Sequence, residues 1–493
     1  MPVYYLEIIV VALGLAMLMI DAFVKLEDKR SIAWLGMLGL AVVFALLFRV
    51  EWPESTDGAF WQFYAADDTF SLYFKGIAIL TTFLVLVMGS IYTPVVVEQT
   101  AKTASGAHPQ AGLGEFFALP MFTCAGLMWM ASANHLVSIF VSLEMVTISF
   151  YVLVAYLRRN VGSLEAGTKY LILGALSTGF LVYGFAWLFG VTGSMSLDGI
   201  SEALTAGDVN VTGALFAFGL ILVALAFKVG GAPFHFWIPD VYQGAPTPVT
   251  AFLSVGSKAA GFIVFLRLVA PFLASEALVI KVTTVLAVIT VLTLLVGNLA
   301  ALPQKNLKRL LAYSSVAHAG FLLMAVACAP VSGRSPGISS AEVIAYYLGA
   351  YLLMTLLAFL AMTIVRTSVA NEDLDSYRGL ARRSPFLALA LVFAMASLAG
   401  IPLTGGFIGK FLVFKLAADQ GQWLLLVVGL IGAAAGFYYY LKVAASMYLK
   451  EPGRNDSTEA ISVSPFAKSV MVVLMVGIIV TGVAPGVILG LLR

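Results

Sequence analysis

Four charged residues lie deep inside long apolar stretches of this 493-residue chain: Glu144, Lys228, Lys258 and Lys410. A charged side chain at the centre of a membrane-spanning helix costs at least about 2.5–3.5 kcal/mol, so residues of this kind are usually retained for function. Burial disfavours the charged form of a lysine, whereas a nearby carboxylate favours it. This combination therefore predicts groups that take up and release protons inside a membrane.

Two histidines accompany these charges. His318 lies in the middle of an apolar stretch, and Ser314 precedes it by one helical turn. A lone histidine of this kind can be a hydrogen-bonded core residue or a proton carrier, and we take His318 as a candidate for the second role. His235 lies just after a predicted helix break at Gly230–Pro233 and is a further candidate. Lys75 lies closer to a helix end, where we expect its ammonium group to reach the headgroup region.

Glycine and proline interrupt two of the apolar stretches, each beside a deep lysine. The segment GGAPFHFWIPDVYQGAPTPVT at 230–250 follows Lys228, and SLAGIPLTGGFIGKFLVF at 397–414 contains Lys410. Proline removes a backbone donor and ends or kinks a helix, and in lipid the freed groups need protein or water partners. Two discontinuous helices are therefore predicted, each next to a hydrated pocket. An odd number of helices separates them, which is typical of inverted-repeat transporters.

The composition identifies the elements that must position these residues. The chain is 61% hydrophobic and only 11% charged, with a mean hydropathy of +0.99, whereas soluble domains are about 25% charged. We predict an all-α polytopic membrane protein of about 14 transmembrane helices with two inverted five-helix repeats, each containing a discontinuous helix. The predicted spans lie near 3–23, 31–50, 71–92, 115–131, 134–157, 167–191, 213–237, 249–270, 277–298, 309–329, 341–365, 385–416, 422–449 and 465–491. The predicted segments are 1–114 (three helices), 115–274 (first repeat, helices 4–8), 275–449 (second repeat, helices 9–13) and 450–493 (helix 14).

The loop charges predict an orientation. Even-numbered loops contain one basic residue, Arg334, and the long loop after the second span contains only acidic charges. By the positive-inside rule, odd-numbered loops face the cytoplasm and both termini face the opposite side of the membrane. The fifteen basic residues of the odd-numbered loops are Lys25, Lys29, Arg30, Lys102, Arg158, Arg159, Lys305, Lys308, Arg309, Arg366, Arg378, Arg382, Arg383, Lys450 and Arg454.

Several function classes are disfavoured by the sequence. A net charge of +2 gives no reason to expect a nucleic-acid partner. The two cysteines, Cys124 and Cys328, form neither a metal motif nor an iron–sulfur spacing, and neither a P-loop nor a dinucleotide-binding fingerprint occurs. We therefore expect this chain to bind no cofactor or redox centre, and to be driven by an ion gradient or by partner subunits.

Two segments closely resemble the antiporter-like membrane subunits of respiratory complex I. They are FKVGGAPFHFWIPDVYQGAPTPVTAFLSVGSK (227–258) and LPQKNLKRLLAYSSVAHAGFLL (302–323). Among the three homologous subunits, LEAGTKYLILGALSTGFLVYG (164–184), the DVYQGAP form of the broken segment and GGFIGKF are most similar to subunit N of bacterial complexes. The resemblance extends over essentially the whole chain.

The resemblance implies roles for single residues. Glu144 matches a glutamate that pairs with the seventh-helix lysine, here Lys228. Lys258 matches the central lysine, Lys410 the lysine at the exit side, and His318 a histidine on the polar axis that connects them. The implied function is proton translocation, as a subunit of a translocase that couples NADH-to-quinone electron transfer to pumping.

The resemblance also implies where the rest of the reaction takes place. FMN, iron–sulfur clusters and quinone are expected in partner subunits. The expected contacts are the adjacent antiporter-like subunit, small membrane subunits and the lipid bilayer. A multi-subunit cation/proton antiporter, or a membrane-bound hydrogenase or formate-linked complex, remains an alternative with the same fold. A purely structural scaffold is disfavoured because it has no use for deep lysines beside broken helices.

Overall fold

The computed structural model describes residues 3–50, 69–100, 110–207, 209–328, 338–369, 371–451 and 459–492. Within these ranges the regular structure is helical, apart from two isolated β-bridges, His135 with Ser196 and Asn306 with Asp373. The acidic loop after the second predicted span and the basic residues Lys102, Arg334 and Arg454 lie outside the described residues.

The predicted fold class is confirmed. In the described part of the chain, 13 helices are long and apolar enough to cross a membrane, and a broken pair supplies the remaining predicted span. The helices long enough by themselves are α1 (Tyr5–Phe23), α2 (Arg30–Leu47), α3 (Thr69–Thr100), α4 (Leu113–Ser132), α5 (Leu136–Val154), α6 (Val161–Thr192), α8 (Val211–Val229), α12 (Val279–Ala301), α13 (Leu307–Ala327), α14 (Ser340–Ser368), α18 (Trp423–Tyr448) and α19 (Pro465–Val483). One further span joins α10 (Thr247–Phe252), a π-helical turn η2 (Leu253–Ser257) and α11 (Lys258–Ala274), while the broken span consists of α16 (Pro385–Ala399) and α17 (Gly405–Asp419). The short helices are α7 (Leu197–Ala206), α9 (Trp237–Gly244), η3 (Leu374–Tyr377), α15 (Leu380–Arg383) and α20 (Gly486–Leu489).

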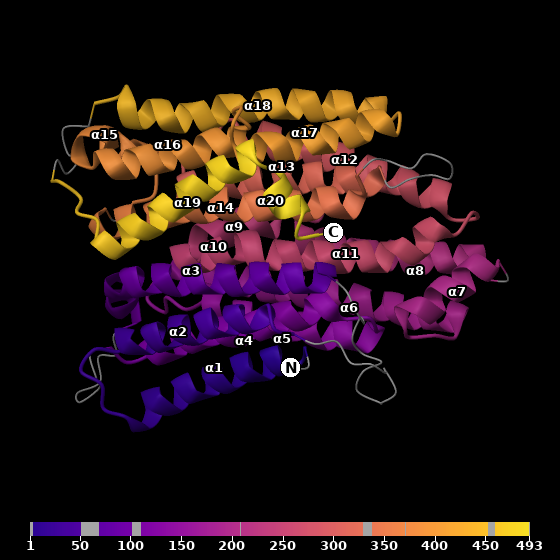
Figure 1. Ribbon diagram of the computed structural model, residues 1–493, viewed down its shortest axis with the longest axis horizontal. Helices are drawn as coiled ribbons and strands as arrows, with labels where there is room; N and C mark the ends of the chain where they lie inside the picture. Colours follow the sequence, from indigo (N-terminus) through magenta and orange to yellow (C-terminus); the bar gives the residue numbers. More distant parts are fainter. Residues whose placement is uncertain are drawn as a thin grey trace.

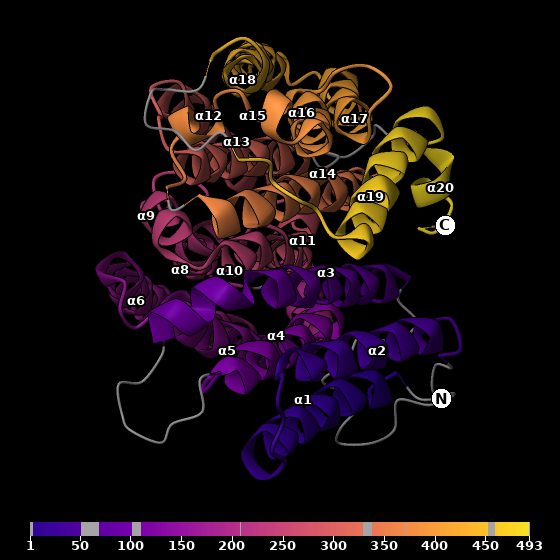
Figure 2. The same ribbon diagram turned by 90° about the vertical axis from the view of Figure 1, so that its left-hand side faces the viewer.

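The long helices run roughly side by side along the longest axis of the molecule (Figure 1). Figure 2 shows them stacked from α1 and α2 at one edge, through α3 and α14, to α18 at the other edge, with α18 nearly end-on and α1, α2 and α3 inclined to it. The chain then returns, so that α19 packs against α14 and α17.

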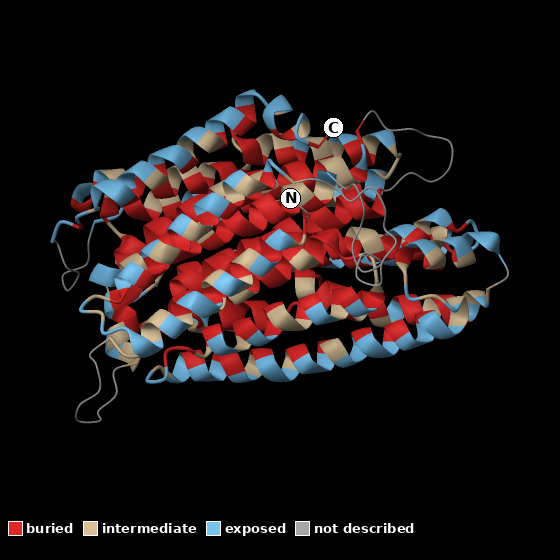
Figure 3. Cartoon of the chain, turned by 60° about the horizontal axis from the view of Figure 1, so that its bottom comes forward, coloured by how far each residue is buried: buried red, intermediate tan, exposed pale blue. Residues whose placement is uncertain are grey.

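The centre of the bundle is shielded from lipid on all sides. In the most apolar windows of α10–α11 and of α13, 94% of the residues are buried, whereas only 33% are buried in α6, α12, α18 and α19. Figure 3 shows this as buried central helices behind outer helices with exposed outward faces. Polar side chains are therefore tolerated on the central helices, because they find partners on neighbouring helices rather than lipid.

Both predicted helix breaks are present, and both begin with a glycine in the same backbone conformation. Gly230 follows α8 with φ +86°, and Gly400 follows α16 with φ +88°, a left-handed conformation that favours glycine. In each case the next residue also donates its N–H to the helix: Gly231 to Ala226 at 2.7 Å, and Ile401 to the Ala396 carbonyl at 3.0 Å. These are the bonds of a Schellman motif, which satisfies carbonyl groups at the end of a helix.

Several predicted boundaries were wrong. The third helix continues to Thr100 with Pro94 inside it, and the sixth begins at Val161 rather than near 167. The last long helix ends at Val483, because Pro485 follows, instead of continuing to 491. The short amphipathic helix α7 was not predicted, since its ten residues fall within a segment that we took as a loop.

The prediction that Lys75 reaches the headgroup region was also wrong. Lys75 is completely buried, and its Nζ lies 2.7 Å from Glu7 Oε1. Glu7 lies near the start of α1 and Lys75 near the start of α3, so the pair ties these two helices together. A buried charge with a close counter-ion avoids much of the cost of an unpaired one.

Candidate functional site

Glu144 and Lys228 each bind a threonine. Lys228 is the penultimate residue of α8, and its Nζ donates a hydrogen bond to Thr147 Oγ1 of α5 at 2.8 Å. Glu144 lies one turn before Thr147 on the same helix and accepts a hydrogen bond from Thr178 Oγ1 of α6 at 2.8 Å. Among the described residues, no ion pair joins Glu144 to Lys228, so the direct pairing implied by the resemblance is absent from this structure.

A small cavity connects Lys228 with the next helix of the site. Its volume is about 20 Å³, and Thr147, Lys228 and Ser257 supply polar groups to its wall. A cavity needs about 10–15 Å³ and two to four polar partners to hold a water molecule. Ser257 immediately precedes Lys258, so this cavity extends from the first lysine to the helix that carries the second, although Lys258 itself is not in its wall.

Lys258 lies at the junction of the π-helical turn η2 and α11. Its side chain is buried and donates to both the carbonyl oxygen and Oγ of Ser315 on α13, the latter at 2.5 Å. The ammonium group also lies over the ring of Tyr351 on α14, 5.0 Å from its centroid. The Tyr351 hydroxyl is held by Ser254 Oγ at 3.0 Å. π-helical turns occur frequently at functional sites, and here the turn directly precedes the buried ammonium group.

His318 lies between two tyrosine hydroxyls. Its Nδ1 is 2.7 Å from Tyr347 Oη of α14, and its Nε2 is 3.1 Å from Tyr440 Oη of α18. The Tyr440 hydroxyl also contacts Ser314 Oγ. All four side chains are buried. Both ring nitrogens are therefore satisfied while the imidazole is neutral, since one nitrogen can donate and the other accept.

Lys410 closes the break between α16 and α17. Its Nζ donates to the carbonyl oxygens of Leu398 at 2.9 Å and Ala399 at 2.8 Å, which are the last two residues of α16. These carbonyl groups have no partner within the helix, and the C-terminal end of a helix carries partial negative charge. The ammonium group also lies 5.4 Å from the ring centroid of Phe321 on α13.

One face of α13 carries or contacts three of the predicted residues, namely His318, Lys258 and Lys410. Ser315, His318 and Phe321 are spaced three residues apart and therefore share a face of the helix. Lys258 contacts the first of them and Lys410 the last. Helix α13 is thus the element that connects the central lysine to the lysine at the second break.

His235 stands apart from this line. It is buried in the turn between α8 and α9 and lies beside Phe236. Among the described residues, no hydrogen bond or ion pair joins His235 to the other candidates, and its Nδ1 has no hydrogen-bond partner. Its role stays a prediction.

Sequence reasoning missed the hydroxyl groups that join the charges. Tyr347 and Tyr440 contact His318, while Thr178 and Ser315 bind Glu144 and Lys258. The signal was present in YYLGAY (346–351) and FYYYLK (437–442), where tyrosines recur inside otherwise apolar helices. Buried tyrosine hydroxyl groups usually need a polar partner, so these runs mark polar contacts within the membrane.

The comparisons with known proteins identify a family. Residues 133–436 match the family model described as NADH:quinone oxidoreductase/Mrp antiporter, TM. The chain is 39% identical to NADH-quinone oxidoreductase subunit N of Trichlorobacter lovleyi, over 98% of this chain and 94% of the relative. It is 35% identical to the subunit N of Rhodospirillum rubrum, over 90% of this chain and 87% of the relative.

Solved structures share the architecture. A chain of respiratory complex I from Thermus thermophilus with bound aureothin superposes with a TM-score of 0.77 at 32% identity, covering 98% of both chains. A chain of the archaeal membrane-bound sulfane sulfur reductase gives a TM-score of 0.82 at 24% identity, covering 99% of this chain and 96% of the other. The similarity to the reductase chain shows only that the two chains share a fold. The length and identity of the matches to the curated relatives show that the chain belongs to the family of NADH-quinone oxidoreductase subunit N.

Proposed function

We propose that this chain moves protons across the bacterial inner membrane as a subunit of NADH-quinone oxidoreductase, along a line of buried side chains from Glu144 and Lys228 through Lys258 and His318 to Lys410. One observation carries the proposal. Lys258, His318 and Lys410 all lie on or against a single buried helix, α13: Lys258 binds Ser315, two tyrosine hydroxyl groups flank His318, and Lys410 lies over the ring of Phe321.

The contacts suggest an order of proton transfer. A proton held by Lys228 can reach Lys258 through a water molecule in the cavity that Thr147 and Ser257 line. From Lys258 it can pass to Ser315, whose Oγ accepts a hydrogen bond from the ammonium group at 2.5 Å. Lys410, at the second break, releases it to the other side. Moving one charge against a potential of 100 mV costs about 2.3 kcal/mol, so the drive must come from outside the chain.

His318 can pass a proton without holding a net charge. If Tyr347 donates to Nδ1, Nε2 carries the hydrogen and donates to Tyr440; exchanging the tautomer reverses both bonds. A proton added from one hydroxyl group and lost to the other completes the transfer. This chemistry needs both hydroxyl groups, because each ring nitrogen has one partner.

The proposal also covers the partner subunits, the orientation in the membrane and the internal repeats. FMN, iron–sulfur clusters and quinone are assigned to partner subunits, and the adjacent antiporter-like subunit and small membrane subunits are the expected neighbours. We place the odd-numbered connections in the cytoplasm and both termini in the periplasm. We also retain 115–274 and 275–449 as the two inverted repeats, and His235 as a candidate proton carrier.

Purification of the complex tests the proposed function. An affinity tag on this chain should recover flavin, iron–sulfur clusters and NADH:quinone reductase activity, and the reconstituted complex should acidify one side of a vesicle when NADH is added. Recovery of a complex without flavin or NADH oxidation would favour the antiporter or hydrogenase alternative. Family membership at 35–39% identity to named relatives supports the first outcome.

Removal of the Tyr347 hydroxyl group tests the histidine relay. In Tyr347→Phe, His318 Nδ1 loses its partner at 2.7 Å while the ring keeps its place against Gly409. Proton pumping is expected to fall at least about tenfold, within the range for losing a proton-transfer group. The matched control is Tyr346→Phe, because the neighbouring hydroxyl binds the Thr481 carbonyl at 2.6 Å, away from the line. Equal pumping by the two variants would contradict the relay.

A further inference from the structure

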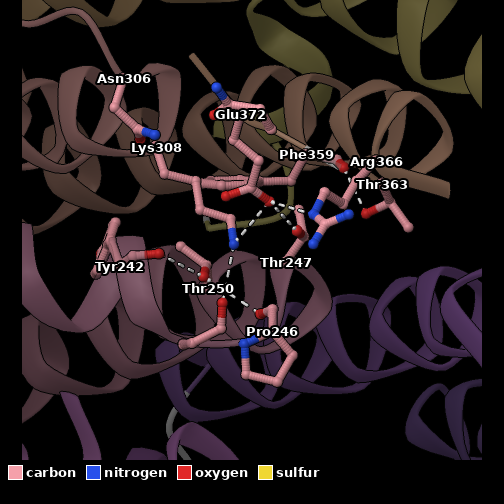
Figure 4. A network of polar contacts seen from close by, with 12 residues as sticks. Tyr242, Pro246, Thr247, Thr250, Asn306, Lys308, Phe359, Thr363, Arg366 and Glu372 are labelled. Carbon is pink, nitrogen blue, oxygen red and sulfur yellow. Dashed lines mark hydrogen bonds and ion pairs between the residues drawn. The ribbon is translucent and has the colours of Figure 1, made fainter. Parts of the chain in front are cut away.

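A charged cluster outside the proton line joins the first broken segment to the start of α13 and to the connection after α14 (Figure 4). Lys308 on α13 is buried, lies 2.9 Å from Glu372 Oε1 and donates to the Ala245 carbonyl at 2.9 Å. The same carboxylate oxygen accepts a hydrogen bond from Thr247 Oγ1 at 3.0 Å, and Arg366 Nε lies 3.7 Å from it. We refer to Thr247, Lys308, Arg366 and Glu372 as the latch.

The latch connects elements that are far apart in the sequence. Ala245 follows α9 and Thr247 begins α10, so both lie beyond the first helix break. Lys308 belongs to the first turn of α13, and Glu372 lies after α14. The contacts therefore hold the bend between α9 and α10 against the helix that carries Ser315 and His318.

The backbone around Glu372 is fastened independently of its side chain. The Glu372 carbonyl accepts a hydrogen bond from the Leu307 N–H at 3.0 Å, and the Leu374 N–H donates to the Lys305 carbonyl at 2.7 Å. Removing the charge of Glu372 therefore leaves this connection attached to the start of α13. The carboxylate itself acts between α13 and α10.

The latch and Lys258 join the same two helices at different depths. Lys308 precedes Ser315 by seven residues, which is about 10 Å along a helix. Ser315 is the residue to which Lys258 donates. Helices α13 and α10–α11 are thus held together once at the latch and once at the central lysine.

The space between these two levels contains hydroxyl groups. Thr250 Oγ1 donates to the Tyr242 carbonyl at 3.0 Å, and the Tyr242 hydroxyl lies 3.2 Å from Ser315 Oγ. If α10 separated from α13 at the latch, entering water would find polar partners up to Ser315. With the latch closed, protein groups occupy these positions.

One carboxylate decides whether the latch is attractive or repulsive. With Glu372 ionised, Lys308 and Arg366 have a shared counter-ion. Without its charge, two cations remain beside each other in a poorly solvated place, and like charges there repel strongly. A neutral hydrogen-bonding side chain can keep the bond from Thr247 but cannot offset that repulsion.

We propose that Glu372 is a positioning residue of proton translocation: its ion pair with Lys308 holds α10 against α13 and closes the cytoplasmic approach to Lys258. The inference rests on the proposed function, because it assumes that Lys258 carries protons. In the orientation predicted from the loop charges, the residues of the latch belong to cytoplasmic connections. Opening of this contact would expose the central lysine to that side only.

Glu372→Gln in the assembled complex tests the inference. We expect NADH:quinone electron transfer to stay close to that of the parent complex, since the Glu372 carboxylate contacts none of the residues placed on the proton line. Protons pumped per electron should fall, and passive proton conductance of vesicles under an imposed potassium potential should rise several-fold. The control is Asp375→Asn, which removes an exposed carboxylate 2.5 Å from Arg378 three residues further on. If the glutamine variant pumps as many protons per electron as this control and conducts protons no faster, the proposal is overturned.

Further variants separate this inference from the proposed function and from misfolding. If Glu372→Gln fails to assemble, the double variant Lys308→Met/Glu372→Gln removes both charges, a change that buried pairs often tolerate. The double variant also loses the hydrogen bond that Lys308 donates to the Ala245 carbonyl at 2.9 Å, so the bend before α10 is no longer held to α13 at this level. It should assemble and leak, and a tight double variant would overturn the inference. Normal pumping by Lys258→Met would instead reject the proposed function. If Lys258→Met does not pump and Glu372→Gln shows no increase in proton conductance, only the inference about the latch is rejected.

Discussion

Replacement of Lys258 by methionine is expected to abolish proton pumping while the complex still assembles. The ammonium group is buried and bound only to Ser315 among hydrogen-bond acceptors of the described chain, so no neighbouring lysine replaces it there. Loss of a proton-transfer group commonly reduces a rate about a hundredfold or more. Methionine fills a similar volume and removes the cost of burying a charge, so stability should not suffer.

The measurement is the initial rate of NADH-driven proton uptake into vesicles, normalised to the amount of assembled complex. Lys415→Met is the matched control, because Lys415 also belongs to a membrane helix but forms an exposed pair with Asp419 at 2.8 Å. It should pump normally. If the Lys258 variant pumps at the rate of this control, the central lysine has no part in proton transfer.

Replacement of Glu144 by glutamine is expected to reduce pumping at least about tenfold, which corresponds to about 1.4 kcal/mol in the barrier. Glutamine can still accept the hydrogen bond that Thr178 donates at 2.8 Å, so the variant removes the charge and keeps the contact. Lys228, held by Thr147 one turn further on, loses the carboxylate closest to it along α5.

Glu144→Asp provides the second arm of this experiment. It preserves the charge on a shorter side chain, and we expect pumping intermediate between the parent and the glutamine variant. Glu165→Gln is the control, since Glu165 lies on the neighbouring helix α6 with an exposed carboxylate bound to Lys169. A glutamine variant at position 144 that pumps like this control would show that the charge of Glu144 is not needed for proton translocation.

Periodic and topological features of the site could be predicted from the sequence. The depth of Lys258 follows from counting apolar residues, and the breaks after Gly230 and Gly400 follow from glycine and proline chemistry. The spacing of the two breaks also predicts opposite topology. These inferences need only the local chain and a membrane of known thickness.

Contacts between distant helices could not be predicted in the same way. Lys75 was assigned to the headgroup region because it lies near a helix end, yet Glu7 of another helix holds it in the core at 2.7 Å. Lys308 was counted among loop charges that set orientation, although it is buried against Glu372. In both cases the partner lies more than 60 residues away, and no local pattern indicates it.

The contact between Lys410 and the end of α16 lets one amine hold the second break in both protonation states. Two backbone carbonyls, of Leu398 and Ala399, accept hydrogen bonds from its Nζ. An ammonium group has three hydrogens and a neutral amine has two, so both carbonyls keep a donor after one proton has left. The third hydrogen is therefore the one available for exchange, and in the proposed cycle discharge of Lys410 leaves the end of α16 satisfied within the membrane.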